Sequence, residues 1–521
     1  MEKEFNVEGK CIPSRHYMAD MSKKLVQTLK MVEKGKYFVI NRPRQYGKTT
    51  ALFSLAAALR ATGNYIVFNT SFEGLDEVDF KNESYFTERF VKLLAESLQS
   101  YQPDAAAALL ALAPSRAGMS DLSSFITDFT TKTDKKIVVL IDEVDQSSNN
   151  ELFVKFLAML RKKYLLRDET KTFHSVVLAG LHDVKPLKFK LSPNEEQKYN
   201  SPWNIAADFD VVMELQPDEI VPMLKDYAQE RQLTMDFKAI ADALFYYTEG
   251  YPFLVSALCK IMDEKILPNR ADQTWTVFDI ETAADRMIKS DISNTNFDSL
   301  IKNLENNAEL YDVIYRIVIE NELVPHNIHA PLISLALQHG ILRNGQVLGI
   351  HNRIYREIIL NYMTVKAITE RKSLYIETSE PYMLANNGLD MRKVLLKFQE
   401  QMRLEYSKKD DSFIERHGRL IFLAFLKPII NGKGYAFKEP EISEERRMDI
   451  AVSFFQHKYV VELKIWRGKI AHDKGLKQLG NYLDRQQLPE GFLVIFEQTV
   501  TKTWKKGWIK VNGKRVFAVW V

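Results

Sequence analysis

The sequence predicts an α/β protein in three parts: a parallel-sheet domain over residues 1–215, a mainly helical domain over residues 216–370, and a mixed α/β domain over residues 371–521. Its length is the first observation, because 521 residues correspond to about three domains of ~100–200 residues. The second is the alternation of short apolar runs with helical stretches from Lys36 to about Leu215, as in parallel strands joined by helices. The third is a change to amphipathic helical segments from Gln216.

Each of the four strands expected in the first domain is apolar enough to be buried on both faces of a sheet. These strands are Tyr37–Asn41, Tyr65–Asn69, Lys136–Ile141 and Ser175–Ala179. The spacing of apolar residues predicts one helix over Tyr17–Glu33, before the first strand, and another over Ala51–Arg60, after it. Because helical runs separate the strands, we expect right-handed crossover connections.

The middle domain is expected to consist mainly of helices, and the last domain of strands and helices together. Amphipathic segments predict middle-domain helices over Pro217–Glu230, Phe237–Thr248 and Pro252–Lys265, with a short strand signal around Gly345–Ile350 and an end near Thr364–Ser373. In the last domain we expect helices over Val394–Tyr406, Phe413–Leu426 and Lys474–Leu483. Its strands are expected over Arg447–Phe455, Lys458–Lys464, Phe492–Phe496 and Arg515–Val521.

The composition excludes several classes of protein. Two cysteines, Cys11 and Cys259, are too few for a disulfide framework or a Cys-based zinc site, and they fit a reducing compartment, so we expect a cytoplasmic location. No apolar stretch approaches the ~20 residues that cross a bilayer, and no membrane association is expected. A hydrophobic content of 46% and a charged content of 27% are ordinary for globular proteins and exclude a disordered chain.

The charge is distributed unevenly along the chain. Residues 371–521 hold 28 Lys and Arg against 18 Asp and Glu, a net charge of +10, whereas the first 370 hold 43 against 50, a net charge of −7. A basic segment beside an acidic remainder predicts that the C-terminal part meets a polyanion such as DNA. Lysines that only keep a surface soluble would give the same balance, so this alternative stays open.

A candidate phosphate-binding loop, Asn41–Thr50 (NRPRQYGKTT), follows the first strand and precedes a helix. In such a loop the helix N-terminus faces the phosphates, Lys48 reaches the β- and γ-phosphate oxygens, and the Thr49 hydroxyl coordinates Mg²⁺. Gly47 lets the backbone approach the nucleotide, and Arg44 and Thr50 complete the candidate ATP-binding residues of the loop. The glycine that usually stands five residues before Gly47 is replaced by Arg42, so the strict motif is incomplete.

A second motif supports the first, because the apolar strand Lys136–Ile141 ends in two acids, Asp142 and Glu143. Asp142 is expected to hold Mg²⁺ directly or through water, and Glu143 to act as a general base on the attacking water. An acidic pair after a strand also occurs in solvated loops. The presence of both motifs in one chain favours the nucleotide site.

The string Phe5-Asn6-Val7-Glu8-Gly9, then Tyr17, and then the loop Asn41–Thr49 resemble the AAA-like ATPases of bacteria and archaea, whose loops carry RPR-x-(F/Y)-GK-(T/S) without the first glycine. The resemblance spans about residues 1–365 and implies a P-loop ATPase core followed by a helical lid or winged-helix-like domain. It also implies that Ser201–Ile205 closes the core and that Glu249–Phe253 begins a lid helix. A sensor residue is implied near Gly180 or His182, and the sequence does not distinguish between them. It identifies no arginine finger.

The C-terminal part carries a second constellation of charged residues. Asp449 begins one expected strand, and Glu462 and Lys464 lie on one face of the next, since they are two residues apart. Two carboxylates can hold Mg²⁺ or Mn²⁺ against a scissile phosphate, while the lysine orients the attacking water. Because the two acids would repel each other, Lys464 is expected to bridge them when no metal is bound.

The order Glu415, Asp449, Glu462-x-Lys464, Gln478-x-x-x-Tyr482 resembles the PD-(D/E)xK nuclease superfamily, over about residues 380–521. It implies a restriction-endonuclease-like domain with Asp449, Glu462 and Lys464 at its centre, helped by Glu415 and oriented by Gln478. Met448 stands where the motif has proline.

Three interpretations remain open. In the leading one, an ATPase switch gates Mg²⁺-dependent DNA cleavage; in the others, the nuclease-like domain only binds DNA, or serves as an adaptor in a nucleotide-controlled scaffold. Tryptophans Trp466, Trp504 and Trp508 among Lys502, Lys505, Lys506 and Lys510 could stack bases, or could belong to a core beside a lysine-rich hairpin. A homo-oligomer is compatible with the sequence but not indicated by it.

Overall fold

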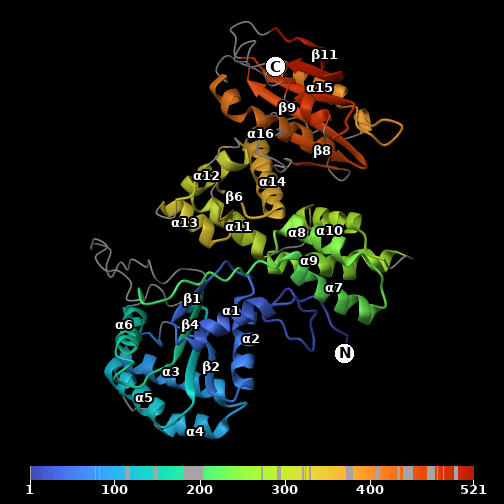
Figure 1. Ribbon diagram of the computed structural model, residues 1–521. Coiled ribbons are helices and arrows are strands. Elements are labelled where there is room, and N and C mark those ends of the chain that lie inside the picture. The colour runs from blue at the N-terminus through green and yellow to red at the C-terminus, as the bar shows by residue number, and fades with distance from the viewer. Residues whose placement is uncertain are drawn as a thin grey trace. The chain divides into compact units, whose positions relative to one another are not determined.

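The computed structural model describes residues 2–76, 78–80, 82–111, 118–144, 151–180, 203–270, 274–289, 295–319, 322, 324–327, 330–345, 347–370, 380–405, 411–430, 434–437, 450–465, 476–477, 479–484, 486–497 and 503–521. The chain forms two compact units (Figure 1). The first unit contains Met1–Leu300 and His326–Ile354, and the second contains Ile301–Pro325 and Tyr355–Val521. The domain limits expected at residues 215 and 370 stay predictions.

The first unit is built on a parallel sheet of four strands in the order β1-β4-β3-β2. The strands are β1 (Phe38–Asn41), β2 (Tyr65–Ser71), β3 (Lys136–Asp142) and β4 (Ser175–Gly180). All four predicted strands are confirmed, and so is their parallel pairing. Burial follows the prediction too, since every residue of β4 and six of the seven residues of β3 are buried.

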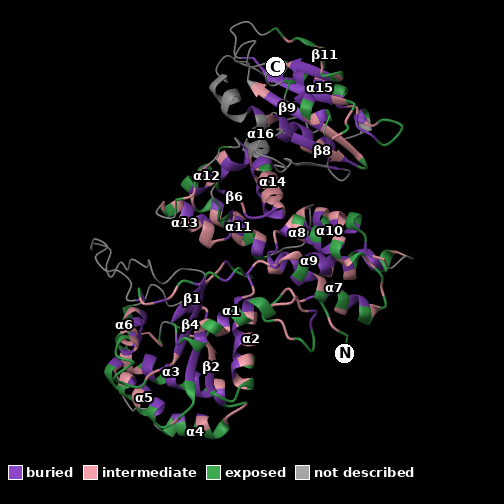
Figure 2. Cartoon of the chain, in the orientation of Figure 1, coloured by how far each residue is buried: buried purple, intermediate pink, exposed green. Residues whose placement is uncertain are grey.

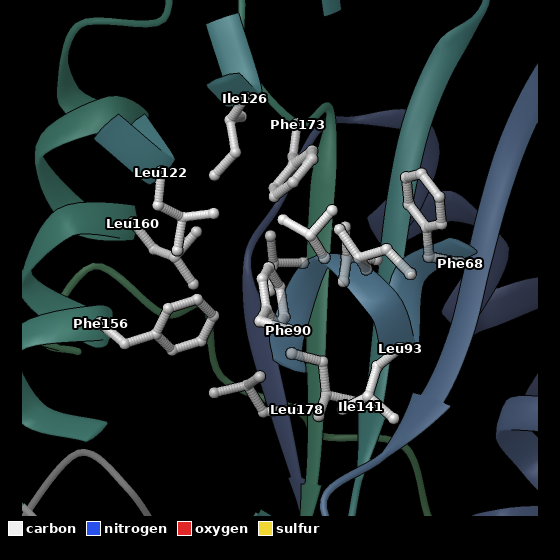
Figure 3. Packing of buried hydrophobic residues seen from close by; sticks show 14 of the residues in the cluster. Phe68, Phe90, Leu93, Leu122, Ile126, Ile141, Phe156, Leu160, Phe173 and Leu178 are labelled. Atoms are coloured by element: carbon white, nitrogen blue, oxygen red, sulfur yellow. The ribbon is translucent and has the colours of Figure 1, made fainter. Parts of the chain in front are cut away.

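Helices cover both faces of this sheet. Those of the first unit's N-terminal half are α1 (Ser22–Glu33), α2 (Lys48–Ala61), α3 (Glu83–Leu98), α4 (Pro103–Ala111), α5 (Met119–Thr131) and α6 (Glu151–Leu165). One large apolar cluster joins α3 to α6 with alternate residues of the strands, such as Ile137, Val139 and Ile141 of β3. In Figure 3, Phe156 and Leu160 of α6 point toward the strands that carry Ile141 and Leu178. The intervening residues of β3 face α2, which explains why both sides of these strands are apolar.

The first helix starts later than its periodicity suggests. The prediction placed its beginning at Tyr17, but α1 begins at Ser22. The Tyr17 N–H donates to the carbonyl of Glu4 instead, at 3.1 Å, and the Asp20 carboxylate accepts from the N–H of Ser22 at 2.9 Å. The pairing of the N-terminal segment with residues 16–17, followed by this turn, therefore takes the place of the first helical turn.

The rest of the first unit is mainly helical, as predicted. Its elements are α7 (Pro217–Arg231), α8 (Phe237–Thr248), α9 (Pro252–Ile261), the π-helical turn η2 (Met262–Ile266), the 3₁₀ turn η3 (Leu267–Asn269), α10 (Val277–Lys289), α13 (Pro331–Gln338) and the short hairpin strands β5 (Leu342–Arg343) and β6 (Gly349–Ile350). The predicted helix over Pro252–Lys265 thus continues as a wider π-helical turn after Ile261. Helix α11 (Thr295–Glu305) runs across the boundary into the second unit.

The second unit contains a mixed sheet in the order β11-β12-β10-β9-β8-β7. Its strands are β7 (Gly434–Phe437), β8 (Ile450–Phe454), β9 (His457–Ile465), β10 (Glu490–Phe496), β11 (Lys506–Val511) and β12 (Lys514–Trp520), and its helices are α12 (Ala308–Val318), α14 (Arg353–Glu370), α15 (Met391–Glu405) and α16 (Asp411–Ile430), with a 3₁₀ turn η4 (Glu380–Tyr382). Strand β10 pairs in parallel with β9 and β12, and the other neighbours pair antiparallel. The four predicted strands correspond to β8, β9, β10 and β12, and two of the predicted helices correspond to α15 and α16. Strands β7 and β11 are additional, and the helix predicted over Lys474–Leu483 lies partly outside the described residues.

Two apolar layers lie on opposite faces of the second sheet. Phe492, Val494 and Phe496 of β10 pack in one cluster with α15 and α16, while Leu493 and Ile495 pack in the other with Leu476, Leu479 and Leu483. The inner strands of both sheets are mostly buried, and the helices around them are more exposed (Figure 2). Among the helices that the structure describes, none combines the length and the apolar character needed to cross a bilayer.

Candidate functional site

The parallel sheet of the first unit brings its chemically active residues to one edge. Because β1, β3 and β4 are parallel, their carboxyl ends lie at the same edge, where ligands bind in open α/β sheets. The phosphate loop follows β1, and the acidic pair Asp142-Glu143 follows β3. Strand β4 lies between these two strands, an order that the sequence alone did not predict.

The loop leads directly into α2, whose N-cap is Gly47. This glycine has φ +80°, in the left-handed region that glycine adopts without steric cost. Lys48 is the first residue of the helix and is 6% exposed. Its ammonium donates to the carbonyls of Arg42 at 2.8 Å and Pro43 at 2.9 Å, so the charge lies inside the loop. The predicted loop-and-lysine arrangement is therefore present in the fold.

The structure also brings Thr49 and Asp142 together. The Thr49 hydroxyl donates to Asp142 Oδ2 at 2.6 Å, and Asp142 is 6% exposed. The other carboxylate oxygen, Oδ1, accepts from the N–H of Glu143 at 3.0 Å. A hydroxyl and a carboxylate oxygen are the donor types that Mg²⁺ prefers, so these two residues fit the ion that the sequence implies.

Glu143 has an unusual backbone conformation. Its φ is +53°, in the left-handed region, which is uncommon for a residue with a side chain. Such conformations persist where the surrounding structure imposes them, often at functional sites. Glu143 lines the cavity described next, and so does Glu73 from the segment after β2.

A cavity of about 440 Å³ opens at this edge of the sheet, a volume within the range of small-molecule sites. Its lining includes the loop residues from Arg44 to Thr50 and the acids Glu73 and Glu143. The remaining wall comes from the N-terminal segment and from the first turns of α9, through Asn6, Val7, Gly9, Cys11, Pro252, Phe253 and Ser256. The predicted cofactor residues Arg44, Gly47, Lys48, Thr49 and Thr50 all line it. Asp142 is not in the lining, and it reaches the site through Thr49.

Two residues of the loop have roles that the motif does not reveal. The Thr50 hydroxyl accepts from the N–H of Cys11 at 3.0 Å and so fastens the N-terminal segment to α2. The Arg42 guanidinium, which stands where the strict motif has glycine, donates to the carbonyl of Val211 at 2.9 Å and lies 5.5 Å from the ring centroid of Phe209. Arg42 therefore anchors the loop to the segment that follows the core.

A buried polar cluster next to the loop was missed by sequence reasoning. The Tyr46 hydroxyl donates to Glu214 at 2.7 Å and lies 2.9 Å from His351 Nε2. Burial lowers the pKa of His351 to about 4, so its imidazole is neutral near pH 7. Burial also raises the pKa of the Tyr46 hydroxyl, helped by the nearby Glu214 carboxylate. No local pattern links Tyr46 to a histidine 305 residues away, so the sequence held no signal for this contact.

The resemblance also implied a segment that closes the core, the start of a lid helix and a sensor residue, and the structure describes residues of the first two. Trp203, within the segment expected to close the core, is fully buried in the apolar cluster of the sheet. Helix α9 begins at Pro252, within the segment expected to start a lid helix. His182, one of the two sensor candidates, lies outside the described residues, and Gly180 ends β4.

The second predicted constellation is described in part. Glu462 lies on β9 with 1% of its surface exposed, and Lys464 Nζ lies 2.5 Å from its Oε1. Both residues lie on the same strand face as Val460, which belongs to the apolar cluster of Leu476, Leu479 and Leu483. Asp449 and Gln478 lie outside the described residues, as does the side chain of Glu415 on α16. Within the described parts of the chain, no group of three or more His, Cys, Asp or Glu side chains could hold a metal ion.

Comparisons with known proteins give partial matches. No curated protein sequence matches the chain. A Walker-type ATPase of Pyrococcus abyssi is 13% identical over 68% of this chain and 99% of its own, with a TM-score of 0.47. The Aeropyrum pernix ORC2 protein, in ADPNP–ADP complexes, is 13% identical over 70% of this chain and 97% of its own, with a TM-score of 0.37. The Thermotoga maritima RuvB Holliday junction branch migration motor is 16% identical over 68% and 98%, with a TM-score of 0.33.

A protein-family model gives the more local match. It covers residues 23–186, from within α1 to just beyond the end of β4. That segment contains all four strands of the first sheet, the phosphate loop and the acidic pair. The phosphate loop and the acidic pair of the candidate site therefore lie within a segment similar to the family described as "Predicted AAA-ATPase", while the cavity wall formed by the N-terminal segment and α9 lies outside that segment.

Proposed function

We propose that the chain binds ATP with Mg²⁺ in the cavity of the first unit and hydrolyses it. The observation that carries this proposal is the convergence at one sheet edge of the Lys48 ammonium, the Thr49–Asp142 pair and Glu143. Lys48 and Thr49 begin α2, which follows β1, whereas Asp142 ends β3 and Glu143 follows it; β4 lies between these two strands in the sheet. The similarity of residues 23–186 to the AAA-ATPase family agrees with the proposal.

Each residue has a distinct part in this chemistry. Lys48 balances the negative charge of the β- and γ-phosphates, which would compete with the loop carbonyls for its ammonium. Thr49 and Asp142 would hold Mg²⁺, which when bound offsets phosphate charge. Glu143 accepts a proton from water as that water attacks the γ-phosphorus. The new P–O bond forms as the bond to the β,γ-bridging oxygen breaks, and the products are ADP and inorganic phosphate.

Calorimetry with Mg²⁺ and ATP tests the binding step. We expect Lys48→Ala to abolish measurable binding because it removes the ammonium that lies inside the loop, where the β- and γ-phosphates would bind. Lys135→Ala is the matched control, since Lys135 is an exposed lysine of the same unit outside the cavity. Equal affinity of Lys48→Ala and wild type would refute the proposed site.

We also propose that the basic C-terminal part binds DNA. The support is the outward face of the edge strand β11, where Lys506, Trp508 and Lys510 are exposed and alternate with partly buried residues. The guanidinium of Arg515, on the neighbouring strand β12, lies 4.9 Å from the Trp508 ring centroid. Cations beside an exposed aromatic ring suit a polyanion with stackable bases.

Whether this part also cleaves DNA depends on Glu462 and Lys464. The 2.5 Å contact between Lys464 Nζ and Glu462 is the charge balance expected of a carboxylate site, and it suits both a nuclease and a passive adaptor. We propose a metal-dependent nuclease whose activity follows the nucleotide state of the first unit, with Asp449 as the second carboxylate. The alternative function is a nucleotide-controlled scaffold in which this part only binds.

Cleavage of linear and supercoiled DNA by the full chain separates these functions. We expect cleavage with Mg²⁺ or Mn²⁺ that depends on ATP and is lost in Glu462→Gln while DNA binding is kept. Glu490→Gln is the control, because Glu490 is a carboxylate of the neighbouring strand β10 that pairs with Arg515 instead. DNA binding without cleavage under every metal and nucleotide condition would leave the adaptor function.

A further inference from the structure

Each residue of the loop from Pro43 to Tyr46 contacts the mainly helical part of the same unit or the segment leading into it. A Cβ on Gly340 would lie 2.8 Å from Pro43 Cγ, which shows how closely the two chain segments approach. The carbonyl of Arg44 accepts from the Tyr251 hydroxyl at 2.5 Å. The side-chain oxygen of Gln45 accepts from Asn296 Nδ2 at 2.8 Å. Tyr46 contacts Glu214 and His351, as described above.

The Tyr46 contacts form a directed chain of hydrogen bonds. Since the Tyr46 hydroxyl has one proton and donates it to Glu214, its oxygen accepts from His351 Nε2. The imidazole then carries its proton on Nε2, and its Nδ1 can accept from the Asn352 amide, 3.5 Å away. The donors all point toward the carboxylate, an order in which neighbouring hydrogen bonds strengthen one another.

The loop itself has little intrinsic tendency to adopt this shape. Arg42 replaces the first glycine of the strict motif, and Gln45 has φ +56°, in the left-handed region that favours glycine. A non-glycine residue keeps such a conformation only where its surroundings impose it. The contact of the Gln45 side chain with Asn296 is one such constraint.

From these contacts we propose that five residues outside the loop, which we call the brace, hold the phosphate loop in its binding shape, and that nucleotide binding in turn stabilises the brace. The brace consists of Glu214, Tyr251, Asn296, Gly340 and His351, which are positioning residues and not catalytic ones. This inference rests on the proposed ATP site. By thermodynamic linkage, any brace residue that raises nucleotide affinity is itself stabilised by bound nucleotide to the same extent.

Part of the brace lies close in the sequence to the helix that leads into the second unit. Gly340 and His351 flank the β5–β6 hairpin, and α14 begins at Arg353, two residues after His351. Helix α14 carries the chain from the first unit into the second. Arg353 is itself fixed, since its guanidinium lies 3.8 Å from the ring centroid of Tyr246 on α8. Nucleotide occupancy would therefore stabilise the residues from which the second unit is connected.

The first test compares glycine variants of the full chain by calorimetry with Mg²⁺ and ADP. Gly340→Ala should weaken binding about tenfold or more, because the new methyl group must displace Pro43. Gly63→Ala is the matched control: Gly63 also has a left-handed φ, +73°, but an added Cβ there would meet nothing within 4 Å. The two variants share the backbone strain and differ in contact with the loop.

The second test uses the histidine, and it keeps the proposal falsifiable if Gly340→Ala fails to fold. His351→Leu should raise the KM for ATP about tenfold with a smaller change in kcat, and His351→Gln should restore much of the affinity because its amide can donate to Tyr46. Hydrogen exchange at residues 340–351 should slow on adding ADP in wild type and not in Lys48→Ala.

The outcomes distinguish this inference from the proposed function. If wild type binds ADP and both Gly340→Ala and His351→Leu bind it equally well, the brace is refuted and the ATP site stands. If His351→Leu and His351→Gln lose affinity equally, the cause is packing and the hydrogen-bonded chain is refuted. If wild type binds no nucleotide, the proposed function itself fails.

Discussion

At the scale of single residues, the proposed function assigns nucleotide binding and the activation of water to different residues. Lys48 and Asp142 are buried, and the exposed Thr49 contacts Asp142 through its hydroxyl, while Glu143 lines the open cavity in a left-handed backbone conformation. The first three therefore suit charge balance and ion binding. Glu143 suits proton transfer at the surface of the cavity.

Exchange of Glu143 for glutamine should uncouple these two functions. Glu143→Gln is expected to bind ATP like wild type but to release phosphate about 10²–10⁴-fold more slowly, because the general base is removed and the ion ligands remain. Phosphate release and calorimetry on the same preparation measure both. Glu73→Gln is the control, since Glu73 is a second carboxylate of the cavity lining. A normal turnover rate in Glu143→Gln would remove it from the role of base.

The buried His351 predicts a pH dependence of stability. Burial, with a smaller contribution from Arg343, lowers its pKa to about 4 from the ordinary 6.5, while Glu214 opposes the shift. Because the folded pKa is the lower one, the stability contribution is complete above pH 6.5 and is lost as the pH falls toward 4. The decrease in the free energy of unfolding should reach about 2 kcal/mol by pH 5, measured by urea unfolding.

The control for this dependence is His351→Gln, which cannot titrate. Burial also lowers the pKa of His174, so wild type and variant share part of the acid sensitivity, and the difference between them isolates His351. Identical destabilisation of both proteins between pH 7.5 and pH 5 would show that His351 titrates normally in the folded chain.

The sequence predicts a contact between two residues when both belong to recognisable motifs. Thr49 and Asp142, which the sequence assigns to one Mg²⁺ ion, are in contact, because the loop follows one strand, the acid ends another, and parallel strands share an edge. The contacts of Tyr46 and Gly340 could not be predicted, since their partners lie in the helical part and carry no pattern of their own. Packing between distant segments, and not local propensity, decides those contacts.

At the scale of elements, helix α1 is joined to α7 by a buried ion pair. Lys24 contacts Glu219, with side-chain exposures of 7% and 6%, and the carboxylate also accepts from the N–H of Gln216 at 2.8 Å, which caps α7. A buried pair contributes little net stability compared with apolar residues, but removing one partner leaves an uncompensated charge. We therefore expect the pair to favour one register of the two helices more than it stabilises the fold.

Replacing one residue of the pair should lower the free energy of unfolding much more than replacing both. Lys24→Met is expected to lower the free energy of unfolding by about 3–5 kcal/mol, because Glu219 stays buried without its cation. The double variant Lys24→Met, Glu219→Gln should recover a large part, since glutamine keeps an acceptor for the cap. Lys23→Met is the control, because the Lys23–Asp218 pair is exposed, with side-chain exposures of 72% and 63%. Urea unfolding of both single variants and the double variant measures this coupling. If the losses in Lys24→Met and Glu219→Gln simply add in the double variant, the two residues are not coupled.

The elements themselves were largely predictable, and their order was not. Four apolar runs identified the strands of the first sheet, but β4 inserts between β1 and β3 although it follows both in the chain. Helix α1 starts at Ser22 because hydrogen bonds from residues 4 and 20 compete with its first turn. Periodicity reports which face is buried, while such tertiary hydrogen bonds set where an element begins.

At the scale of the whole molecule, the acidic and basic parts of the chain correspond to its two proposed functions. The acidic first part, with a net charge of −7, holds the candidate ATP site, and the basic part from residue 371, with +10, holds the exposed face of β11. Negative charge around most of the chain would repel DNA, so association should be confined to the basic part. The salt dependence of DNA binding should therefore come from lysines of this part of the chain.

Binding of the full chain to DNA should weaken steeply with salt, since neutralising each phosphate releases counterions. Lys506→Ala with Lys510→Ala should reduce the slope of log affinity against log salt by about 0.9 for each phosphate of duplex DNA that these lysines neutralise. Trp508→Ala should instead weaken binding to single strands by about 1–3 kcal/mol per stacked base and leave the slope unchanged, because stacking releases no counterions. The control is Lys132→Ala with Lys135→Ala, which removes two exposed lysines from the first unit. Fluorescence anisotropy from low to moderate salt measures all four proteins, and equal slopes for both double variants would mean that the β11 face does not meet the phosphates.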